Sequence, residues 1–391
     1  MLKVNAQKFC ERLGIEFAEE LVPYYEKGEK LYAENGNKAV DTERLTQINT
    51  KYNAYRLHFA EVIKAAELVA EDRDMVVWVY TLIAMMAENA PVKYLPVPDR
   101  EHADTDFLPL FSFMWYFDDM ADAMAKRGVP FEVISDTLHE FEAETNDYFG
   151  LYGRRGIRRY VGWFMHFFRG EILRIGRLNF EMTTLSRDIR VYEKDGDIKV
   201  LMDDLDMHRS GMVFGSSGQD DEAGRYHAVI TETPDSVTGY AANEYGECDP
   251  EPITLTGYKE VLRKGDSIIS VHIPALDQLT TENCESAYSK DREIFTKCYP
   301  EHGYKAFCCF SWMMEKRLRQ IMGRDTNITR FADKYTGFPL KSGGSAVNSF
   351  LFHVPEKVEL SELPEDSSMQ RAVKKYLLDG GMFYEKGGVF L

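Results

Sequence analysis

The first part of the chain carries a helical pattern of hydrophobic residues. Up to about residue 155, apolar side chains recur at helical spacing, as at Phe9, Leu13, Phe17 and Leu21, which lines one face of an α-helix. Further stripes of this kind cover residues 45–68, 75–90, 110–126 and 130–148. The stretch 75–90 is apolar nearly all round, so it is predicted to be a central helix. Glycine and proline stand at the joints, and this part is predicted to be a helical bundle.

The pattern changes to that of strands after residue 150. Residues 172–182 alternate apolar and polar side chains, which is the period of a half-buried strand. More strands are predicted at residues 198–202, 226–233 and 267–273. Residues 239–247 and 252–255 look like loop or hairpin, and the Gly- and Ser-rich stretch 211–224 is predicted to be a mobile loop.

The most informative region runs from residue 264 to residue 335. An apolar strand at 267–273 ends at Pro274, and Thr280, Thr281 and Glu282 suit the start of a helix that runs to Cys298. A second apolar strand follows at 306–313, then helices at 315–322 and 327–335. A strand–helix–strand crossover places its two strands near parallel in one sheet. Since ligands bind beyond the carboxyl ends of such strands, residues 271–275 and 311–314 are the expected site.

These patterns predict an α+β protein with two domains. Residues 1–160 are expected to form an all-α N-terminal bundle, and residues 161–391 a mixed β-sheet domain flanked by helices. Of the 391 residues, 44% are hydrophobic and 13% aromatic, which is enough apolar material for two cores and excludes a disordered chain.

The net charge and the cysteine content argue against several classes of function. A net charge of −17 repels phosphate backbones, so we expect no nucleic-acid partner. Six scattered cysteines without a C-x-x-C pair predict neither a disulfide framework nor a zinc site, and they favour a reducing compartment. The longest apolar run, at 75–87, is too short to cross a membrane, and no signal segment opens the chain. We therefore expect a cytoplasmic protein that acts on a small molecule.

One acidic motif points to metal chemistry. Asp118, Asp119 and Asp122 match the D-D-x-x-D pattern of magnesium-dependent prenyl-diphosphate enzymes, and Asp118 and Asp122 would share a helix face. The second metal cluster of those enzymes, N-D-x-x-S-x-x-x-E, has no counterpart at a plausible distance. A solvated acidic helix end is therefore the favoured interpretation, with a magnesium-dependent diphosphate enzyme as a minor hypothesis.

Other candidate residues each have a structural alternative. His272 ends a predicted strand and would suit a general base, because imidazole titrates near neutral pH; the alternative is a core histidine bonded to the backbone. Cys308 and Cys309 have no base beside them and are favoured as small buried residues. The basic stretch 154–159 is either a solvated helix start or a contact for an acidic partner or a cofactor phosphate.

Several of these segments carry a family resemblance. They resemble the bacterial acyltransferase domain-containing proteins, in which a helical N-acyltransferase N-terminal domain precedes a GNAT-like C-terminal domain. The resemblance spans essentially the whole chain and is strongest over residues 163–335. The segments that carry it are Trp163, Leu173–Glu181, Gly265–Asp266, Val271–Pro274, Glu282–Ser286, Ser311–Met314, Thr326–Ile328 and Phe331.

The resemblance implies an enzyme that transfers an acyl group from acyl-CoA to an amine. It implies that the pantetheine arm pairs with the backbone of residues 267–273, and that the diphosphate lies at the start of the next helix. The expected cofactor-binding residues are Val271, Ile273, Ala275, Thr280, Thr281, Ser311, Trp312 and Asn327. His272 is the expected base, Glu285 the fallback base and Tyr288 a candidate acid.

One departure from the family pattern supports an alternative function. GNAT domains have a basic, glycine-rich loop before this helix, whereas residues 274–282 contain no glycine and two acidic residues. The alternative is a catalytically degenerate GNAT-fold module that binds a small molecule or peptide.

Overall fold

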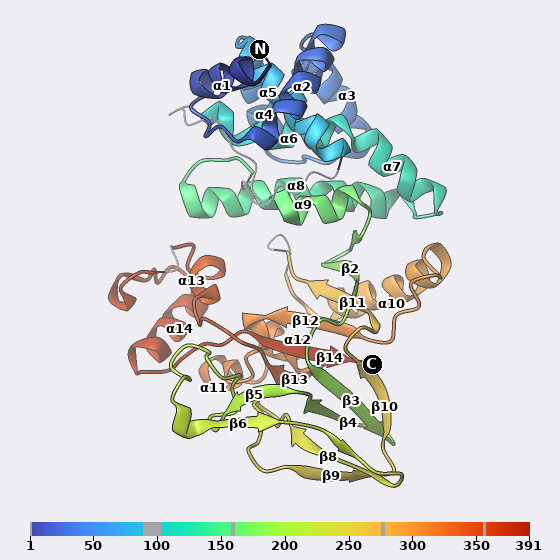
Figure 1. Ribbon diagram of the computed structural model, residues 1–391, viewed down its shortest axis with the longest axis vertical. Helices are drawn as coiled ribbons and strands as arrows, with labels where there is room; N and C mark the ends of the chain where they lie inside the picture. Colours follow the sequence, from blue (N-terminus) through green and yellow to red (C-terminus); the bar gives the residue numbers. More distant parts are fainter. Residues whose placement is uncertain (1, 89–102, 158–160, 275–277, 355–356) are drawn as a thin grey trace. The chain divides into compact units, whose positions relative to one another are not determined.

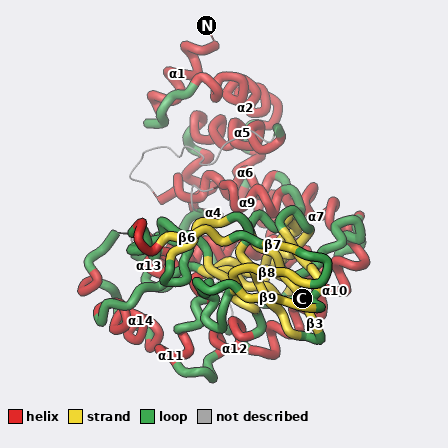
Figure 2. Tube along the Cα trace, turned by 60° about the horizontal axis from the view of Figure 1, so that its bottom comes forward, coloured by secondary structure: helices red, strands yellow, loops and turns green. Residues whose placement is uncertain are grey.

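The chain folds into two compact units: residues 1–176 together with 274–276 form the first, and residues 177–273 with 277–391 form the second. The structure, a computed structural model, describes residues 2–88, 103–157, 161–274, 278–354 and 357–391. Figure 1 shows the course of the chain, and Figure 2 shows helices in the first unit and most of the strands in the second. The domain boundary expected at residue 160 falls outside the described residues and stays a prediction.

The first unit is the predicted helical bundle. Its described helices are α1 (Leu2–Leu13), α2 (Val22–Asn35), α3 (Thr42–Tyr52), α4 (Phe59–Ala70), α5 (Arg73–Ala87), α6 (Leu108–Trp115), α7 (Phe117–Lys126), α8 (Phe131–Tyr152) and α9 (Val161–Phe168). A single short strand, β1 (Ile172–Ile175), follows them. Every residue of α5 from Met75 to Met86 is buried, which confirms the central helix.

Two helices predicted as continuous are broken in the structure. The stripe at 45–68 is divided between α3 and α4, because Asn53 takes a left-handed conformation with φ of 51° and ends α3. The stripe at 110–126 is divided at Tyr116 between α6 and α7. Hydrophobic spacing alone does not show such breaks, since the apolar face resumes in the next helix.

The second unit combines sheets with helices. Its strands are β2 (Leu178–Thr184), β3 (Ile189–Lys194), β4 (Asp197–Met202), β5 (Leu205–His208), β6 (Arg225–Ala228), β7 (Thr231–Glu232), β8 (Ser236–Ala241), β9 (Ile253–Thr256), β10 (Lys259–Arg263), β11 (Ser267–His272), β12 (Phe307–Ser311), β13 (Thr336–Pro339) and β14 (Lys386–Phe390). Its helices are α10 (Thr281–Cys298), α11 (Leu318–Met322), α12 (Asn327–Asp333), α13 (Ala346–Phe350) and α14 (Ser368–Leu378). One sheet runs β2–β11–β12–β14–β13 and another runs β10–β3–β4–β8–β7, with β9 beside β8.

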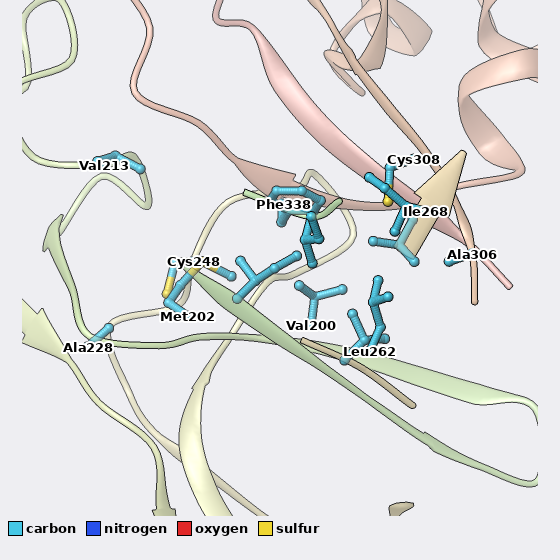
Figure 3. Close-up of a cluster of buried hydrophobic side chains, with 14 of the residues drawn as sticks. Val200, Met202, Val213, Ala228, Cys248, Leu262, Ile268, Ala306, Cys308 and Phe338 are labelled. Carbon is cyan, nitrogen blue, oxygen red and sulfur yellow. The ribbon is translucent and has the colours of Figure 1, made fainter. Parts of the chain in front are cut away.

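The core of this unit lies between the two large sheets. Val200, Met202 and Leu262 of one sheet pack in the same buried cluster as Ile268 and Cys308 of the other, as Figure 3 shows. Side chains alternate along a strand. The even-numbered residues of β11, which include Ile268, therefore face the second sheet, and the odd-numbered residues face away from it.

Helix α10 covers the opposite face of the β11 sheet. Tyr288 of α10 packs edge to face on Phe180 of β2, on Phe307 of β12 and on Phe390 of β14, with ring centroids 5.0–5.8 Å apart. Each such ring, once buried, contributes roughly 2–3 kcal/mol to folding. This packing fixes α10 over the crossover between β11 and β12.

The last strand, β14, was not predicted although it is central to its sheet. It pairs antiparallel with both β12 and β13, and its Lys-Gly-Gly-Val-Phe sequence has low strand propensity. The two glycines have a packing reason, because a Cβ at Gly387 would overlap the ring of Phe338 and one at Gly388 would lie 2.7 Å from Tyr335 Cβ. The constraint is tertiary, so local pattern does not reveal it.

Other predicted strands are shortened or divided. The strand expected at 172–182 is two strands, β1 and β2, because Gly176 takes a positive φ of 58° between them. The strand expected at 226–233 is divided into β6 and β7, and residues 239–247 and 252–255 contribute to the β8–β9 pair. The predicted loop 211–224 contains the isolated bridge Ser216–Gln219 and a 3₁₀ turn at Glu222–Gly224.

Candidate active site

The predicted crossover is present, and its two strands part before they end. β11 and β12 are parallel, with register pairs Ile269–Phe307 and Ser270–Cys308. On its other side β11 pairs with β2 all the way to His272, opposite Asn179. No pair with β12 beyond Ser270 occurs among the described residues. The strands therefore separate at their carboxyl ends, which is where the sequence placed the site.

The separation exposes main-chain groups of β11 on one side. The Ile269 N–H donates to the Ala306 carbonyl, and the Lys305 N–H donates to the Ser267 carbonyl, so odd-numbered residues of β11 direct their amide groups toward β12. Backbone amides alternate sides along a strand, so the Ile273 N–H points to the same side. Within the described part of the chain no hydrogen bond uses that N–H.

His272 lies at this end of β11 and is held by a carboxylate. Its Nε2 is 2.8 Å from Oε2 of Glu181 on the neighbouring strand β2, and the two side chains are 31% and 15% exposed. A carboxylate on Nε2 favours the imidazole tautomer protonated there, which leaves the lone pair on Nδ1. His272 is therefore a partly exposed imidazole with a defined orientation, as a general base requires.

Glu181 was missed as a site residue, and so was Asn179. Both lie on β2, on the same sheet face as His272. Asn179 is 1% exposed, and its buried side-chain carbonyl oxygen has no hydrogen-bond partner among the residues that the structure describes. The alternation in residues 172–182 could have placed both on one face, but their pairing with β11 spans 91 residues of sequence from Glu181 to His272.

The structure does not bring the other two predicted catalytic residues to His272. Tyr288 is fully buried on the α10 face of the sheet, where its hydroxyl bonds that of Tyr335. Burial raises the pKa of the Tyr288 phenol well above its ordinary value. Glu285 lies on the exposed side of α10 in an ion pair with Lys334. His272 faces the opposite side of the same sheet, so these residues do not form one constellation.

The predicted cofactor-binding residues are spread over several elements. Thr280 is the N-cap of α10 and its hydroxyl accepts from the Asn283 N–H at 3.2 Å, and Thr281 is the first helical residue. Ser311 ends β12 and its hydroxyl accepts from the Met313 N–H.

Trp312 directly follows the end of β12. It is 7% exposed and lies in a buried cluster against which Leu279, just before α10, also packs. Val271 is buried on the α10 face of β11, whereas Asn327 is an exposed residue that begins α12. Ala275 lies outside the described residues.

A buried ion cluster follows β12 and was also missed. Glu315 and Lys386 are each at most 1% exposed, and Lys386 Nζ lies 3.1 Å from Glu315 Oε1. Glu247 joins the cluster at 3.5 Å from Lys386 and 2.6 Å from Arg317. The ion pair between Glu315 and Lys386 connects the turn after β12 with the start of β14. Removing either partner would leave the other as a buried, unpaired charge, which is strongly destabilising.

The alternative chemistries find no support in the described residues. The six cysteines all lie within the described residues, are buried and form no disulfide, and burial raises the pKa of Cys309 to about 12, which opposes a thiolate nucleophile. Asp118 bonds Lys51 and Tyr52, and no metal-binding group of side chains occurs in the part of the chain that is described. Within the same residues, no helix has the length and apolar character needed to span a bilayer.

Two family models match the chain. The model of the GNAT-like C-terminal domain matches residues 172–390, and that of the N-acyltransferase N-terminal domain matches residues 4–170. A search of curated proteins found no match.

Solved structures with the same fold include an acyltransferase in complex with decanoyl-CoA and teicoplanin. It has a TM-score of 0.64 at 19% identity, over 98% of both chains. A mutant acyltransferase in complex with octanoyl-CoA gives a TM-score of 0.64 at 18% identity, over 100% of this chain and 99% of that one. The chain belongs to the family in which an N-acyltransferase N-terminal domain is followed by a GNAT-like C-terminal domain.

Proposed function

We propose that this protein is an N-acyltransferase that transfers an acyl group from acyl-CoA to an amine. The observation that carries the proposal is the separation of β11 from β12 after the Ser270–Cys308 pair. It leaves the Ile273 N–H directed into the gap between two parallel strands. An extended amide-bearing chain such as pantetheine can bond to that strand edge as an added strand would.

His272 is the proposed base in this reaction. The acceptor arrives as an ammonium ion and must lose a proton before its nitrogen attacks the thioester carbonyl carbon. His272 takes that proton at Nδ1 while Glu181 holds Nε2. The new C–N bond forms, the C–S bond breaks, and coenzyme A leaves as a thiolate that then takes a proton.

The diphosphate of acyl-CoA is proposed to bind at the start of α10. This helix has 18 residues, and its first turn presents backbone N–H groups, which favour an anion together with the helix dipole. Thr280 already accepts from the Asn283 N–H, so the N–H groups of Thr281 and Glu282 are the proposed ligands. The Glu282 carboxylate opposes the phosphate, so we expect weaker binding than a basic glycine-rich loop would give.

The acyl donor is proposed to be a medium-chain thioester. The structural neighbours were crystallised with octanoyl-CoA and decanoyl-CoA, and one of them also with teicoplanin, so donors of these lengths are the first to test. We place the reaction in the cytoplasm, because six buried cysteines that form no disulfide fit a reducing compartment.

A ligand-shift series on the full chain tests the function. Decanoyl-CoA, octanoyl-CoA, acetyl-CoA and free decanoate are each titrated while the melting temperature is followed, since a ligand that binds only the folded state stabilises it. We expect saturable stabilisation by the medium-chain thioesters and release of free coenzyme A thiol when amines are added. The absence of any shift up to millimolar thioester would refute the proposal.

The second candidate function, a binding module without turnover, is favoured by the missing glycine-rich loop alone. It predicts the same stabilisation by thioesters but no release of thiol with any amine. It also predicts that His272→Ala leaves ligand binding and the biological activity unchanged, whereas the transferase requires the imidazole.

A further inference from the structure

A cavity of about 310 Å³ lies on the helical unit, and all of its described lining residues belong to that unit. Helix α4 contributes Glu61, Lys64, Ala65 and Leu68, which lie on one face of the helix. The other described lining residues are Phe107, Phe149 near the end of α8, and Gly153, Arg154 and Arg155 after it. A volume of this size is at the lower end of the range of small-molecule sites.

The cavity walls expose large apolar side chains to solvent. Leu68 and Phe149 are each 44% exposed, and both line the cavity. Ala65 and Phe107 are buried beside them and continue the apolar surface inward. A ligand that covered Leu68 and Phe149 would remove this surface from water, at roughly 25 cal/mol per Å² of apolar area. The body of a fitting ligand is therefore apolar.

The rim of the cavity is cationic, in a protein whose net charge is −17. Arg154 is paired with buried Asp106. Arg155 is paired with Glu61 at 3.1 Å, and its guanidinium lies 4.6 Å from the centroid of the Phe149 ring. Lys64 forms no ion pair or hydrogen bond with any described residue, so one positive charge remains uncompensated.

The charges of the described residues favour an anionic ligand. Among these residues, three cations and the two carboxylates of Glu61 and Asp106 leave a single net positive charge at the rim. A polyphosphate would need several unpaired cations, whereas one carboxylate would complete the pairing. A cationic ligand would be repelled by Lys64. It also could not stack on the face of the Phe149 ring that the Arg155 guanidinium already covers.

We propose that this cavity binds an amphipathic monocarboxylate, such as a medium-chain fatty acid. Its hydrocarbon body lies against Leu68 and Phe149, and its carboxylate pairs with Lys64 and reaches the buried, unpartnered Nε of Arg155. The described lining belongs to the helical unit, and the proposal does not depend on the acyl-transfer site proposed on β11.

Calorimetric titration of the full chain with decanoate, decanol and decyltrimethylammonium tests the proposal. All three share one hydrocarbon chain, so differences between them report the head group. We expect saturable binding of decanoate and binding of decanol weaker by about tenfold, because one charge-assisted contact is lost. Equal binding of decanol, tighter binding of the ammonium, or no saturable binding of decanoate would overturn the proposal.

Surface variants locate the bound decanoate without threatening the fold. Lys64→Gln should weaken decanoate and leave decanol unchanged, whereas Leu68→Gln should weaken both. Lys126→Gln, an exposed lysine on α7, is the matched control and should change neither. If Lys64→Gln and Leu68→Gln leave the affinity for decanoate unchanged and decanoyl-CoA displaces it, decanoate binds at the acyl-transfer site. The cavity would then not be a carboxylate site.

Discussion

The catalytic proposal depends on one imidazole and the carboxylate that orients it. Replacing His272 by Gln keeps a similar shape and removes the base, so kcat for acyl transfer should fall by roughly 10²–10⁴-fold. Glu181→Gln should lower kcat by a smaller factor and leave KM for decanoyl-CoA unchanged, because Glu181 positions the imidazole rather than the thioester. Steady-state kinetics on both variants provide the measurement. If His272→Gln keeps full kcat, another residue is the base.

A second residue-scale prediction concerns Asp291, which lies on the buried face of α10 and takes no part in the proposed reaction. Asp291 is fully buried and accepts a 3.4 Å hydrogen bond from Tyr304, and its other carboxyl oxygen has no hydrogen-bond partner among the described residues. Burial raises its pKa to about 8. The folded protein therefore holds a proton on Asp291 that the unfolded chain releases above about pH 4. Tighter proton binding by the folded state stabilises it, and this stabilisation is full below pH 4 and is lost as the pH rises through 8.

The isosteric Asp291→Asn variant measures that loss. The amide imitates the protonated acid, so its contribution to stability does not change with pH. Denaturant unfolding should give the variant and the parent similar free energies at pH 4. The variant should be more stable by on the order of several kcal/mol at pH 8.5. A constant difference between the two proteins across this range would show that the carboxyl group titrates normally.

At the scale of elements, the start of α10 depends on the side chain of Thr280. Its hydroxyl caps the Asn283 N–H, and losing an N-cap costs ~1 kcal/mol. Thr280→Val, which keeps the shape and removes the hydroxyl, should lower the free energy of unfolding by that amount, while Thr280→Ser should preserve it. Urea unfolding curves of the Val and Ser variants provide the measurement. Equal stability of the Val and Ser variants would mean that the cap contributes nothing.

The elements differ in how far the sequence predicts them. The β11–α10–β12 crossover was predictable, because both strands are apolar, Pro274 ends the first and Thr280 begins the helix within one short segment. β14 was not predictable, since its glycines are required by Phe338 and Tyr335. His272 could be proposed from its place on a strand, but Glu181 became a candidate only when the pairing of β2 with β11 was known.

At the scale of the whole molecule, charge should slow the arrival of acyl-CoA. The chain carries a net charge of −17 and the donor is a polyanion, so their long-range interaction is repulsive. Raising NaCl from about 20 to about 300 mM shortens the screening length several-fold and should increase the association rate constant of decanoyl-CoA in stopped-flow measurements. A rate constant that falls with salt would indicate attraction by a local basic surface.

The central claim is that the open edge of β11 holds the thioester arm, and one amide group tests it most directly. Ile273→Pro removes the N–H directed at the gap, which no described residue uses, whereas Ile273→Val keeps it. Calorimetric titration with decanoyl-CoA should show binding weaker by about tenfold for the Pro variant, the value of one hydrogen bond. The Val variant should bind like the parent, and both should keep the parent melting temperature. Parent-like affinity in a folded Pro variant would contradict the account.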